Sequence, residues 1–402
     1  MRICIVAQFY PPETGGGGIA AYARYTAIGL RRRGHDVRVI SKLVPGSEAH
    51  RVVEGIDVYR LASPFQSRRW QRIPVIGRYF RLLRDVLYAW NVRQCLLSLF
   101  DSWLPDIVEY PDIDAEGLFH PSVCLSVVKL HMSHKLMRPL YSAKETGYSR
   151  YGIELLEALA IRRAGGISSP SSWLIREAQR LCITKDAVPR LVLNPIDPNL
   201  FSPGEDSGSR RGLSILYVGR LEPSKGAMVF AEATLKIASE FPQAEFTMIG
   251  ADRLSKAGGS QKGELQDFFM RHGLSHRVQF FGHDSPESYA NHYRNATLFI
   301  MPSLLENCPY TLLEAMSCAK PVIVSNAGGM SEMIVNGENG MLFTPGNASE
   351  IADVAMKLLS DPTQAIALGM AARKTVLERY SLDVVAESTE KFYQTVLEKS
   401  KR

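Results

Sequence analysis

The sequence lacks the features that mark disulfide frameworks, structural zinc sites and membrane-spanning helices. Its six cysteines are scattered over 402 residues, with no CxxC pair and no histidine-rich cluster. This spacing argues against disulfides and structural zinc, and it fits a reducing compartment. No charged segment precedes a long apolar core at the N-terminus, and no uncharged apolar run is long enough to span a bilayer. We therefore expect a cytoplasmic protein without a secretion signal.

Acidic residues are missing from residues 67–84. That segment holds six arginines, which are Arg68, Arg69, Arg72, Arg78, Arg81 and Arg84. Apolar residues recur at helical spacing after Pro74, from Ile76 to Trp90. A basic amphipathic helix of this kind can lie on an anionic membrane surface, which would place the protein peripherally on the inner face of the membrane. The alternative is a core helix with a solvated arginine face, and the sequence leaves both open.

Length and composition indicate an ordinary globular protein with more than one core. A chain of 402 residues exceeds one core, so two domains are expected. Hydrophobic residues make up 46% and charged residues 22% of the chain, and the net charge is a modest +6. No nucleic-acid partner is expected.

Strand-like and helix-like segments alternate along the chain. In the first half, strands are expected at 2–7, 35–40, 57–61, 107–110, 125–130 and 190–193, and helices at 19–33, 152–164 and 172–182. In the second half, strands are expected at 213–218, 244–249, 278–281, 297–301 and 321–324, and helices at 227–240, 264–272, 311–317 and 382–399.

Prolines and glycines interrupt this alternation from Pro195 to Gly212, which is the best linker candidate. We expect an N-terminal domain at 1–195, a linker at 196–212, a C-terminal domain at 213–380 and a final helix within 381–402. Two βα arrays of similar size favour an α/β fold class. Its architecture would be two doubly wound, Rossmann-like parallel-sheet domains that face each other across a cleft.

Two glutamates eight positions apart, Glu306 and Glu314, bracket the stretch ENCPYTLLE. The flanking pattern places Glu306 in a strand-to-helix loop and Glu314 in the helix behind it. Parallel α/β proteins bind ligands outside the carboxyl ends of their strands. Carboxylates there accept hydrogen bonds from hydroxyl groups, and backbone N–H groups at a helix start can hold an anion. A sugar joined to a diphosphate needs both kinds of partner.

A second candidate is the stretch VGRLEPSKG, which follows the first strand of the C-terminal domain. Arg220 and Lys225 would place two cations at the same crevice, with a helix start behind them. Together they can neutralise a diphosphate in binding and during its departure. The alternative is a pair of solvated surface cations.

A glycine-rich loop, PPETGGGG, lies between the first strand and the first helix. Its glycines Gly15, Gly16, Gly17 and Gly18 let the backbone approach a ligand closely. Gly15, Gly17 and Ala20 also match a loose dinucleotide-binding pattern, but the next strand ends in Lys42 where a ribose would need an acid. We favour a substrate-facing loop over a flexible connector. A nucleotide-dependent dehydrogenase is supported by this loop alone.

His131 ends the buried-looking strand CLSVVKL and is the candidate on the N-terminal side. A single histidine at a strand end is more often structural than catalytic. Its expected position at the cleft, with His134 and Lys135 close behind, favours a functional role.

Taken together, these motifs resemble the retaining glycosyltransferases of family 4 (glycosyl transferases group 1), which adopt the GT-B fold. The resemblance covers most of the chain. It includes the glycine loop with GIAAYARYTAIGLRRRGHDV, VVKLH, NPID, VGRLEPSKG, SLLENCPYTLLEAMSCAKPVI and AGGMSEMI with NGENGMLF.

The resemblance implies a role for each candidate residue. Gly219, Arg220 and Lys225 would hold the donor diphosphate, Glu314 would bind the nucleotide ribose, and His131 would contact the sugar from the other domain. Glu306 would face the donor sugar together with the backbone of Asn307, Cys308, Pro309, Tyr310 and Thr311. Gly15 to Gly18 would close on the phosphates or the acceptor. The last helix, at about 382–399, would cross back to the N-terminal domain. The catalytic set is then His131, Arg220, Lys225 and Glu306.

The implied reaction moves a hexose from a nucleotide-diphosphate sugar to a carbohydrate, lipid-linked or small-molecule acceptor, with retention. No cofactor and no metal ion are expected. The sequence departs from the frequent Gly-Phe-Gly after the first glutamate, and Pro309 removes one backbone donor there. A nucleotide-sugar epimerase or hydrolase of the same fold, or a non-catalytic sugar-nucleotide-binding protein, remains an alternative.

Overall fold

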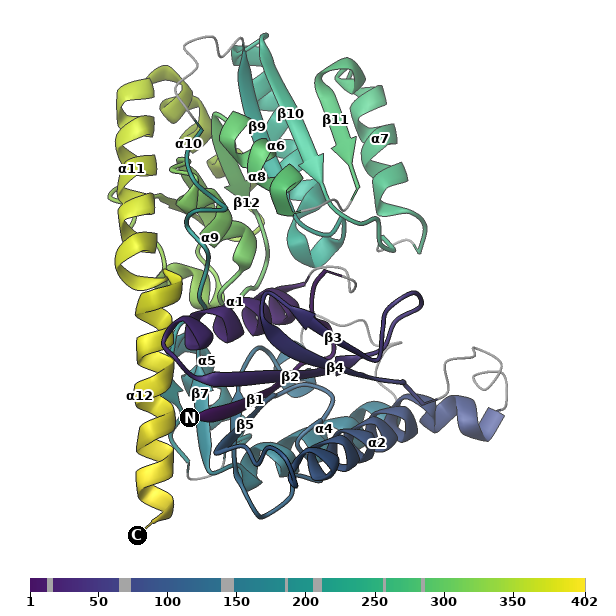
Figure 1. The fold of residues 1–402 in the computed structure, drawn as a ribbon. Helices are drawn as coiled ribbons and strands as arrows, with labels where there is room; N and C mark the ends of the chain where they lie inside the picture. The colour runs from purple at the N-terminus through teal and green to yellow at the C-terminus, as the bar shows by residue number, and fades with distance from the viewer. Residues whose placement is uncertain are drawn as a thin grey trace. The chain divides into compact units, whose positions relative to one another are not determined.

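The computed structural model divides the chain into two compact units (Figure 1). It describes residues 1–12, 17–64, 74–138, 148–184, 187–204, 212–255, 258–282 and 286–401. The first unit contains Met1–Pro195 and Leu382–Arg402, and the second contains Ile196–Ser381.

The described part of the expected linker belongs to the second unit. Ile196 and Phe201 are buried there, and Ser317 Oγ donates a hydrogen bond of 2.6 Å to the carbonyl of Phe201. Prolines interrupt regular structure in this segment, but the apolar side chains between them still pack into a core. The linker expected at 196–212 therefore does not begin at residue 196.

The first unit is built on an eight-stranded sheet in the order β3-β4-β2-β1-β5-β6-β7-β8. Every neighbouring pair is parallel except β3 and β4. The strands are β1 (Arg2–Val6), β2 (Asp36–Lys42), β3 (His50–Val53), β4 (Ile56–Leu61), β5 (Ile107–Pro111), β6 (Leu125–Lys129), β7 (Gly166–Ser169) and β8 (Arg190–Leu191). The helices are α1 (Gly18–Arg32), α2 (Pro74–Leu99), α3 (His134–Met137), α4 (Tyr148–Arg163), α5 (Ser172–Arg180) and α12 (Leu382–Ser400).

Alternation of apolar residues along the strands gives this sheet a core on each face. Ile3 and Ile5 of β1 pack in one core with α1 and α12, whereas Cys4 and Val6 pack in the other with α2, α4 and α5. Successive strand residues point to opposite faces, so a sheet covered on both sides needs a continuous apolar run. ICIV in β1 is such a run.

A buried carboxylate ties α12 to the first unit. Glu109 in β5 accepts hydrogen bonds of 2.8 Å from the hydroxyl of Tyr22 in α1 and from that of Tyr393 in α12. Burial raises the pKa of Glu109, and the positive charge of Lys129 and the two tyrosine hydroxyls lower it in part. The sequence gives no local signal for this contact, because its partners lie 284 residues apart.

The second unit is built on an all-parallel, six-stranded sheet in the order β11-β10-β9-β12-β13-β14. Its strands are β9 (Leu213–Val218), β10 (Ala244–Ile249), β11 (Val278–Phe281), β12 (Leu298–Met301), β13 (Val322–Ser325) and β14 (Met341–Phe343). Its α-helices are α6 (Ala227–Glu240), α7 (Gln261–Arg271), α8 (Pro286–Asn295), α9 (Tyr310–Ser317), α10 (Ala348–Ser360) and α11 (Pro362–Arg379). Short 3₁₀ helices are η4 (Pro223–Lys225), η5 (Ser275–Arg277) and η6 (Gly328–Glu332).

Both sheets reverse their strand order beside their first strand. In the second unit the chain runs from β9 outward to β10 and β11, and then returns to β12 on the other side of β9. In the first unit β1 lies between β2 and β5 in the same way. Loops diverge at such a switch point and leave a crevice at the carboxyl ends of the two strands, where α/β proteins bind ligands.

The expected α/β architecture of two parallel-sheet units is confirmed, and most predicted elements are found within two or three residues of their expected ends. The strands β3, β7 and β14 were not predicted. β3 (HRVV) is a four-residue antiparallel edge strand that begins with two charged or polar residues, β7 (GISS) has a single large apolar residue, and β14 (MLF) has only three residues. Local periodicity cannot identify strands of this kind, because pairing partners define them.

We predict that Tyr393→Phe lowers the free energy of unfolding of the first unit by about 1–3 kcal/mol, because buried Glu109 loses a hydrogen-bond donor. All four tryptophans lie in the part of the sequence that forms this unit, so urea denaturation followed by tryptophan fluorescence reports on it. The exposed Tyr151→Phe is the matched control, with an expected change within about 0.5 kcal/mol. Equal stability of the two variants would contradict the role of the Glu109 contact.

Candidate functional site

The loops after β9 and β12 meet at the switch point of the second sheet. The first carries Gly219, Arg220 and Lys225, and the second carries Glu306. The ammonium of Lys225 forms an ion pair with Oε1 of Glu306, and both side chains are mostly buried. Two strand ends that are distant in sequence thus place opposite charges in contact where a ligand would bind.

Close backbone contacts fix these two loops against each other. Gly226 follows η4 with a φ of +68°, and a Cβ there would lie 2.0 Å from the carbonyl oxygen of Pro302. The amide of Leu304 donates a hydrogen bond of 2.9 Å to the carbonyl of Ser224. Only glycine allows this approach, since a side chain would collide with the neighbouring loop.

The loop after β13 joins the same group. Gly329 donates its amide hydrogen to the carbonyl oxygen of Glu306 at 2.9 Å. Gly328 has a φ of +62°, and a Cβ there would lie 2.1 Å from that same carbonyl oxygen. The backbone of Glu306 is therefore held from one side by the β13 loop, while its side chain contacts Lys225 from the β9 loop.

Arg220 supplies a second and more exposed positive charge. Its Nη2 lies 3.1 Å from Oε1 of Glu222, which also accepts a hydrogen bond of 2.6 Å from Ser224 Oγ. The hydroxyl of buried Tyr217 donates to the carbonyl of Arg220 at 2.9 Å. These contacts hold the Arg220 segment in place, and 48% of the arginine side chain stays exposed.

Residues 307–311 lead from Glu306 into helix α9. The side chains of Asn307, Cys308 and Tyr310 are buried, and Pro309 occupies the N-cap position. No side chain caps the start of α9, which begins at Tyr310 four residues after Glu306. Partial positive charge at this helix start lies close in sequence to Glu306.

Glu314 lies in α9, where its surroundings favour the protonated form. Burial raises the pKa of Glu314 to about 7, and the hydrogen bond of 2.8 Å from the hydroxyl of Tyr293 lowers it in part. The carboxyl therefore changes charge near neutral pH and can accept hydrogen bonds from hydroxyl groups.

The remaining predicted site residues lie in the first unit. Burial and the positive charge of Lys129 lower the pKa of His131 to about 3, so its imidazole is neutral at pH 7. Its amide donates a hydrogen bond of 2.9 Å to Asp112 Oδ1, and its ring lies edge-on to Tyr22. Gly15 and Gly16 fall outside the described residues. Gly17 and Gly18 are exposed at the start of α1, which no side chain caps.

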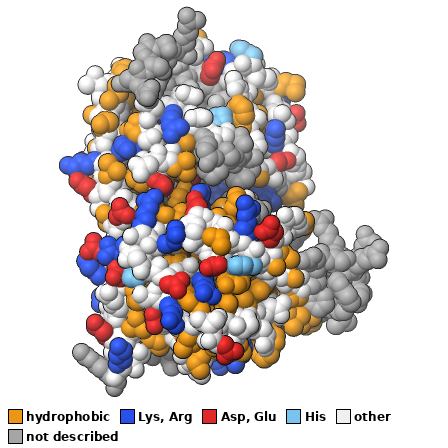
Figure 2. All heavy atoms as spheres, in the orientation of Figure 1, with side chains coloured by type: hydrophobic (Ala, Val, Ile, Leu, Met, Phe, Trp, Pro, Cys, Tyr) orange, Lys and Arg blue, Asp and Glu red, His pale blue; other side chains and the backbone are white. Residues whose placement is uncertain are grey.

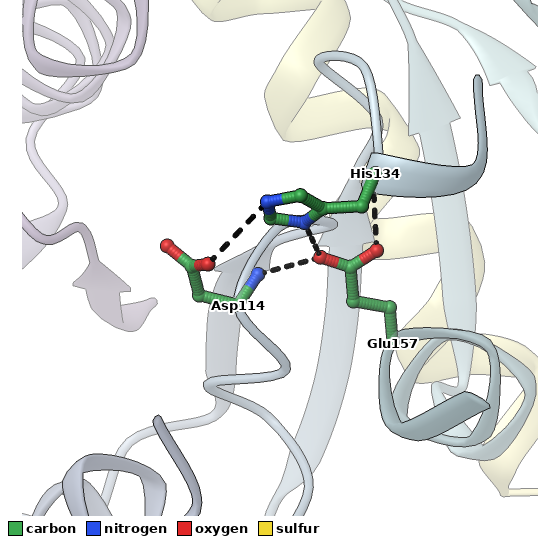
Figure 3. A group of neighbouring side chains, drawn as sticks. All are labelled: Asp114, His134 and Glu157. Atoms are coloured by element: carbon green, nitrogen blue, oxygen red, sulfur yellow. Dashed lines mark hydrogen bonds and ion pairs between the residues drawn. The ribbon is translucent and has the colours of Figure 1, made fainter. Parts of the chain in front are cut away.

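A group of charged side chains that sequence analysis did not identify lies at the carboxyl edge of the first sheet (Figure 3). Glu157 in α4 accepts hydrogen bonds from the amide of Asp114 at 2.8 Å, the amide of His134 at 3.0 Å and His134 Nδ1 at 2.5 Å. Glu157 thereby ties the loop after β5 to the loop after β6. It also supports Asp114, whose φ of +58° is unusual for a residue with a side chain.

The ligand-type atoms of Asp114, His134 and Glu157 lie within 4.8 Å of one another, which is the spacing of a metal site. Arg81 of α2, however, contacts His134 Nε2 and lies 3.4 Å from Asp114 Oδ1. A guanidinium only donates, so Nε2 must accept and the proton of His134 is on Nδ1. Arg81 thus occupies the position at which a metal ion would meet this histidine.

Further contacts extend the group across the switch point between β1 and β5. Gln8, after β1, donates a hydrogen bond of 2.6 Å to Asp114 Oδ2, after β5, and accepts one of 2.9 Å from Lys42. Burial and the charge of Asp114 raise the pKa values of Asp85 and Glu116. The first sheet thus also gathers its charged side chains at its switch point.

Comparison with known proteins identifies the family. Residues 16–200 match the family described as glycosyltransferase family 4, and residues 208–375 match the glycosyl transferases group 1. The chain belongs to the family 4 glycosyltransferases.

Relatives of this glycosyltransferase align with almost the whole chain. Glycogen synthase of Mycobacterium tuberculosis is 25% identical over 405 residues, which cover 98% of this chain and 94% of that protein. Sucrose-phosphate synthase of Thermosynechococcus elongatus has a similar structure, with a TM-score of 0.80 at 20% identity over 99% of each chain. HepE of Anabaena, solved with UDP-glucose, has a TM-score of 0.72 at 20% identity over 98% of this chain and 100% of that one. These structures show the shared GT-B fold.

Several predicted site residues of this glycosyltransferase lie close together in the second unit. Gly219, Arg220, Lys225 and Glu306 lie on adjoining loops, and Asn307 to Thr311 lead from Glu306 into the helix that contains Glu314. Sequence analysis missed Tyr217 and Tyr293, which position this site, and the charged group around Glu157. The acids Asp112, Asp114 and Glu116 directly after β5 were the available signal for that group, because they also follow a strand end.

We predict that ionisation of Glu314 destabilises the second unit. Its folded pKa of about 7 lies above the ordinary value of 4.5, so wild-type stability falls as pH rises through this window. The difference in unfolding free energy between Glu314→Gln and wild type should therefore grow in favour of the variant by up to about 3 kcal/mol from about pH 4.5 to about pH 8. Differential scanning calorimetry across this range measures the difference.

Tyr293→Phe provides the matched test of the hydrogen bond to Glu314. It removes the hydroxyl that lowers this pKa, so the pH window should move upward. A Glu314→Gln difference that stays constant with pH would show that this carboxyl does not titrate near neutrality.

Proposed function

We propose that this protein transfers a sugar from a nucleotide-diphosphate sugar to an acceptor hydroxyl with retention of anomeric configuration. The contact between Lys225 and Glu306, at the switch point of the second sheet, is the observation that carries the proposal. The structure of HepE with UDP-glucose supports this class of donor. The reaction belongs to the synthesis of a polysaccharide, glycolipid or other glycoconjugate.

Arg220 and Lys225 hold the donor diphosphate in this proposal. Lys225 pairs with Glu306 in the described structure, so its charge is already partly compensated. An arriving diphosphate gives Lys225 a second anionic partner. Glu306 can then accept hydrogen bonds from the hydroxyl groups of the sugar. The ion pair thus keeps both side chains oriented until the donor binds.

The other site residues have supporting roles. Glu314 accepts hydrogen bonds from the nucleotide ribose, and the backbone from Asn307 to Thr311 faces the sugar. His131, with its neutral imidazole, contacts the sugar, and Gly17 and Gly18 contact the phosphates or the acceptor.

The chemical step exchanges one bond to the anomeric carbon for another on the same face of the sugar. The acceptor oxygen forms its bond as the bond to the departing phosphate oxygen breaks, and that oxygen takes the acceptor proton. Arg220 and Lys225 stabilise the negative charge that develops on the diphosphate, so the step needs neither a protein nucleophile nor a metal ion. We place the reaction in the cytoplasm, with a carbohydrate, lipid-linked or small-molecule acceptor.

A panel of nucleotide sugars identifies the donor by thermal stabilisation. A ligand present at 100 times its Kd adds about 2.7 kcal/mol to the stability of the folded protein. We expect at least one nucleotide-diphosphate sugar to raise the melting temperature and the matching free sugar not to do so. Stabilisation by a nicotinamide dinucleotide alone would favour a dehydrogenase.

Arg220→Ala and Lys225→Ala test the diphosphate assignment. Each should lower kcat/KM by at least about 30-fold, or about 2 kcal/mol, because each removes a charge that stabilises the departing group. Release of nucleoside diphosphate from the identified donor, with the acceptor that supports the highest rate, gives these constants. Lys236→Ala is the control, because Lys236 is an exposed lysine of the same unit paired with Asp353. Wild-type rates in both site variants would refute the assignment, and donor turnover that needs no acceptor would indicate a hydrolase or epimerase.

A further inference from the structure

Two helices of the first unit, α2 and α4, expose a set of large apolar side chains that the proposed reaction does not use. Its members are Tyr79, Leu83, Trp90 and Leu97 on α2, and Tyr151, Leu155 and Leu159 on α4. We call this set the α2–α4 surface. Figure 2 shows hydrophobic side chains, in orange, gathered over the region where Figure 1 draws α2.

The two helices pack side by side, so their exposed side chains form one surface. A Cβ on Gly152 of α4 would lie 2.9 Å from Leu82 of α2, and Leu156 packs in one cluster with Ala89. The α2 members recur at intervals of four and seven residues, which places them on one stripe of the helix. The opposite side of α2 faces the sheet through Tyr88, Val92 and Leu96. Helix α2 is therefore apolar on two sides.

Neither helix exposes an acid. Their only acidic residues are Asp85, Glu154 and Glu157, and all three are buried. Among the described side chains, the same helices contain Arg81, Arg84 and Arg93 on α2, and Arg162 and Arg163 on α4. Arg138 adds a guanidinium 5.0 Å from the ring of Tyr151. Asp85 pairs with Arg81 and Arg84, and Glu154 pairs with Arg138. The arginines still outnumber these acids, so the net charge around the α2–α4 surface is positive.

We propose that the α2–α4 surface docks on an anionic lipid bilayer. Its apolar side chains would enter the boundary between headgroups and acyl chains, and its arginines would contact lipid phosphates. Tyrosine and tryptophan, which are prominent in the set, favour this boundary because their rings are apolar and their polar atoms stay hydrated. In the described part of the chain, no helix is long and apolar enough to cross a membrane, so the attachment would be peripheral. This proposal does not depend on the donor or on the residues that bind it.

Co-sedimentation of the purified full chain with vesicles tests the proposal. Vesicles of phosphatidylcholine alone are compared with vesicles in which about a third of the lipid is phosphatidylglycerol. We expect binding to the anionic vesicles that weakens as salt is raised, and little binding to the neutral ones. Leu155→Glu should lower the partition coefficient on anionic vesicles at least about tenfold, because an exposed leucine that would enter the bilayer is replaced by a charge that the anionic lipid repels.

Leu254→Glu is the matched control. Leu254 lies in the second unit and is 72% exposed, as is Leu155, so neither substitution disturbs a core. The control should bind vesicles as the wild type does, and circular dichroism should give both variants the wild-type spectrum. The proposal would be overturned if the wild-type protein did not bind anionic vesicles, or if the Leu155→Glu protein bound them as strongly as the wild type. Sedimentation velocity that shows a dimer broken only by Leu155→Glu would assign the surface to a second copy of the chain instead.

Discussion

The contact between Lys225 and Glu306 depends on the order of strands in the second sheet and organises the site around it. The two residues are 81 positions apart, and they meet because β12 returns to lie beside β9. Glycines at 226 and 328 then allow three loops to approach within backbone contact, which side chains would prevent. A partly buried ion pair costs solvation on both sides, and it is strongest when both charges are held in place. Here backbone contacts between the loops hold both residues in place.

In the first unit, a different set of charged residues also joins loops at the switch point of its sheet. Its charged group joins strand ends across the switch point beside β1, with Gln8 between Lys42 and Asp114. Glu157 is buried and takes three donors, which satisfies a carboxylate that would otherwise be costly to place in a core. Arg81, in α2, forms an ion pair with Asp114 that compensates the negative charge of its carboxylate. Buried acids of this unit therefore position arginines and loops, and they also remove negative charge from the outer faces of α2 and α4. The internal network and the positively charged outer surface are two consequences of one arrangement.

Much of the fold could be predicted from local pattern. Continuous apolar runs such as LSILYV identified buried parallel strands, and β9, α6, β10 and β11 were predicted with the ends that the structure shows. Glycine and proline marked the loops that follow them. The strands β3, β7 and β14 were missed because β3 is a short edge strand, β7 has a single large apolar residue and β14 has only three residues. The expected linker was misplaced at its start, because a segment rich in proline still buries Ile196 and Phe201.

The sequence alone determined which residues stand at the ends of strands, and thus that Arg220, Lys225 and Glu306 were candidates for one site. The spacing of apolar residues and the positions of glycine and proline are local properties, so they can be recognised without a structure. Only the tertiary structure decided that β12 lies beside β9, that Tyr293 reaches Glu314, and that Gln8 bridges to Asp114 over 106 residues. It also decided which carboxyls are ionised, since pKa values such as that of Glu314 follow from burial and neighbours. Strand order and burial arise from packing among distant segments, and no local pattern encodes them.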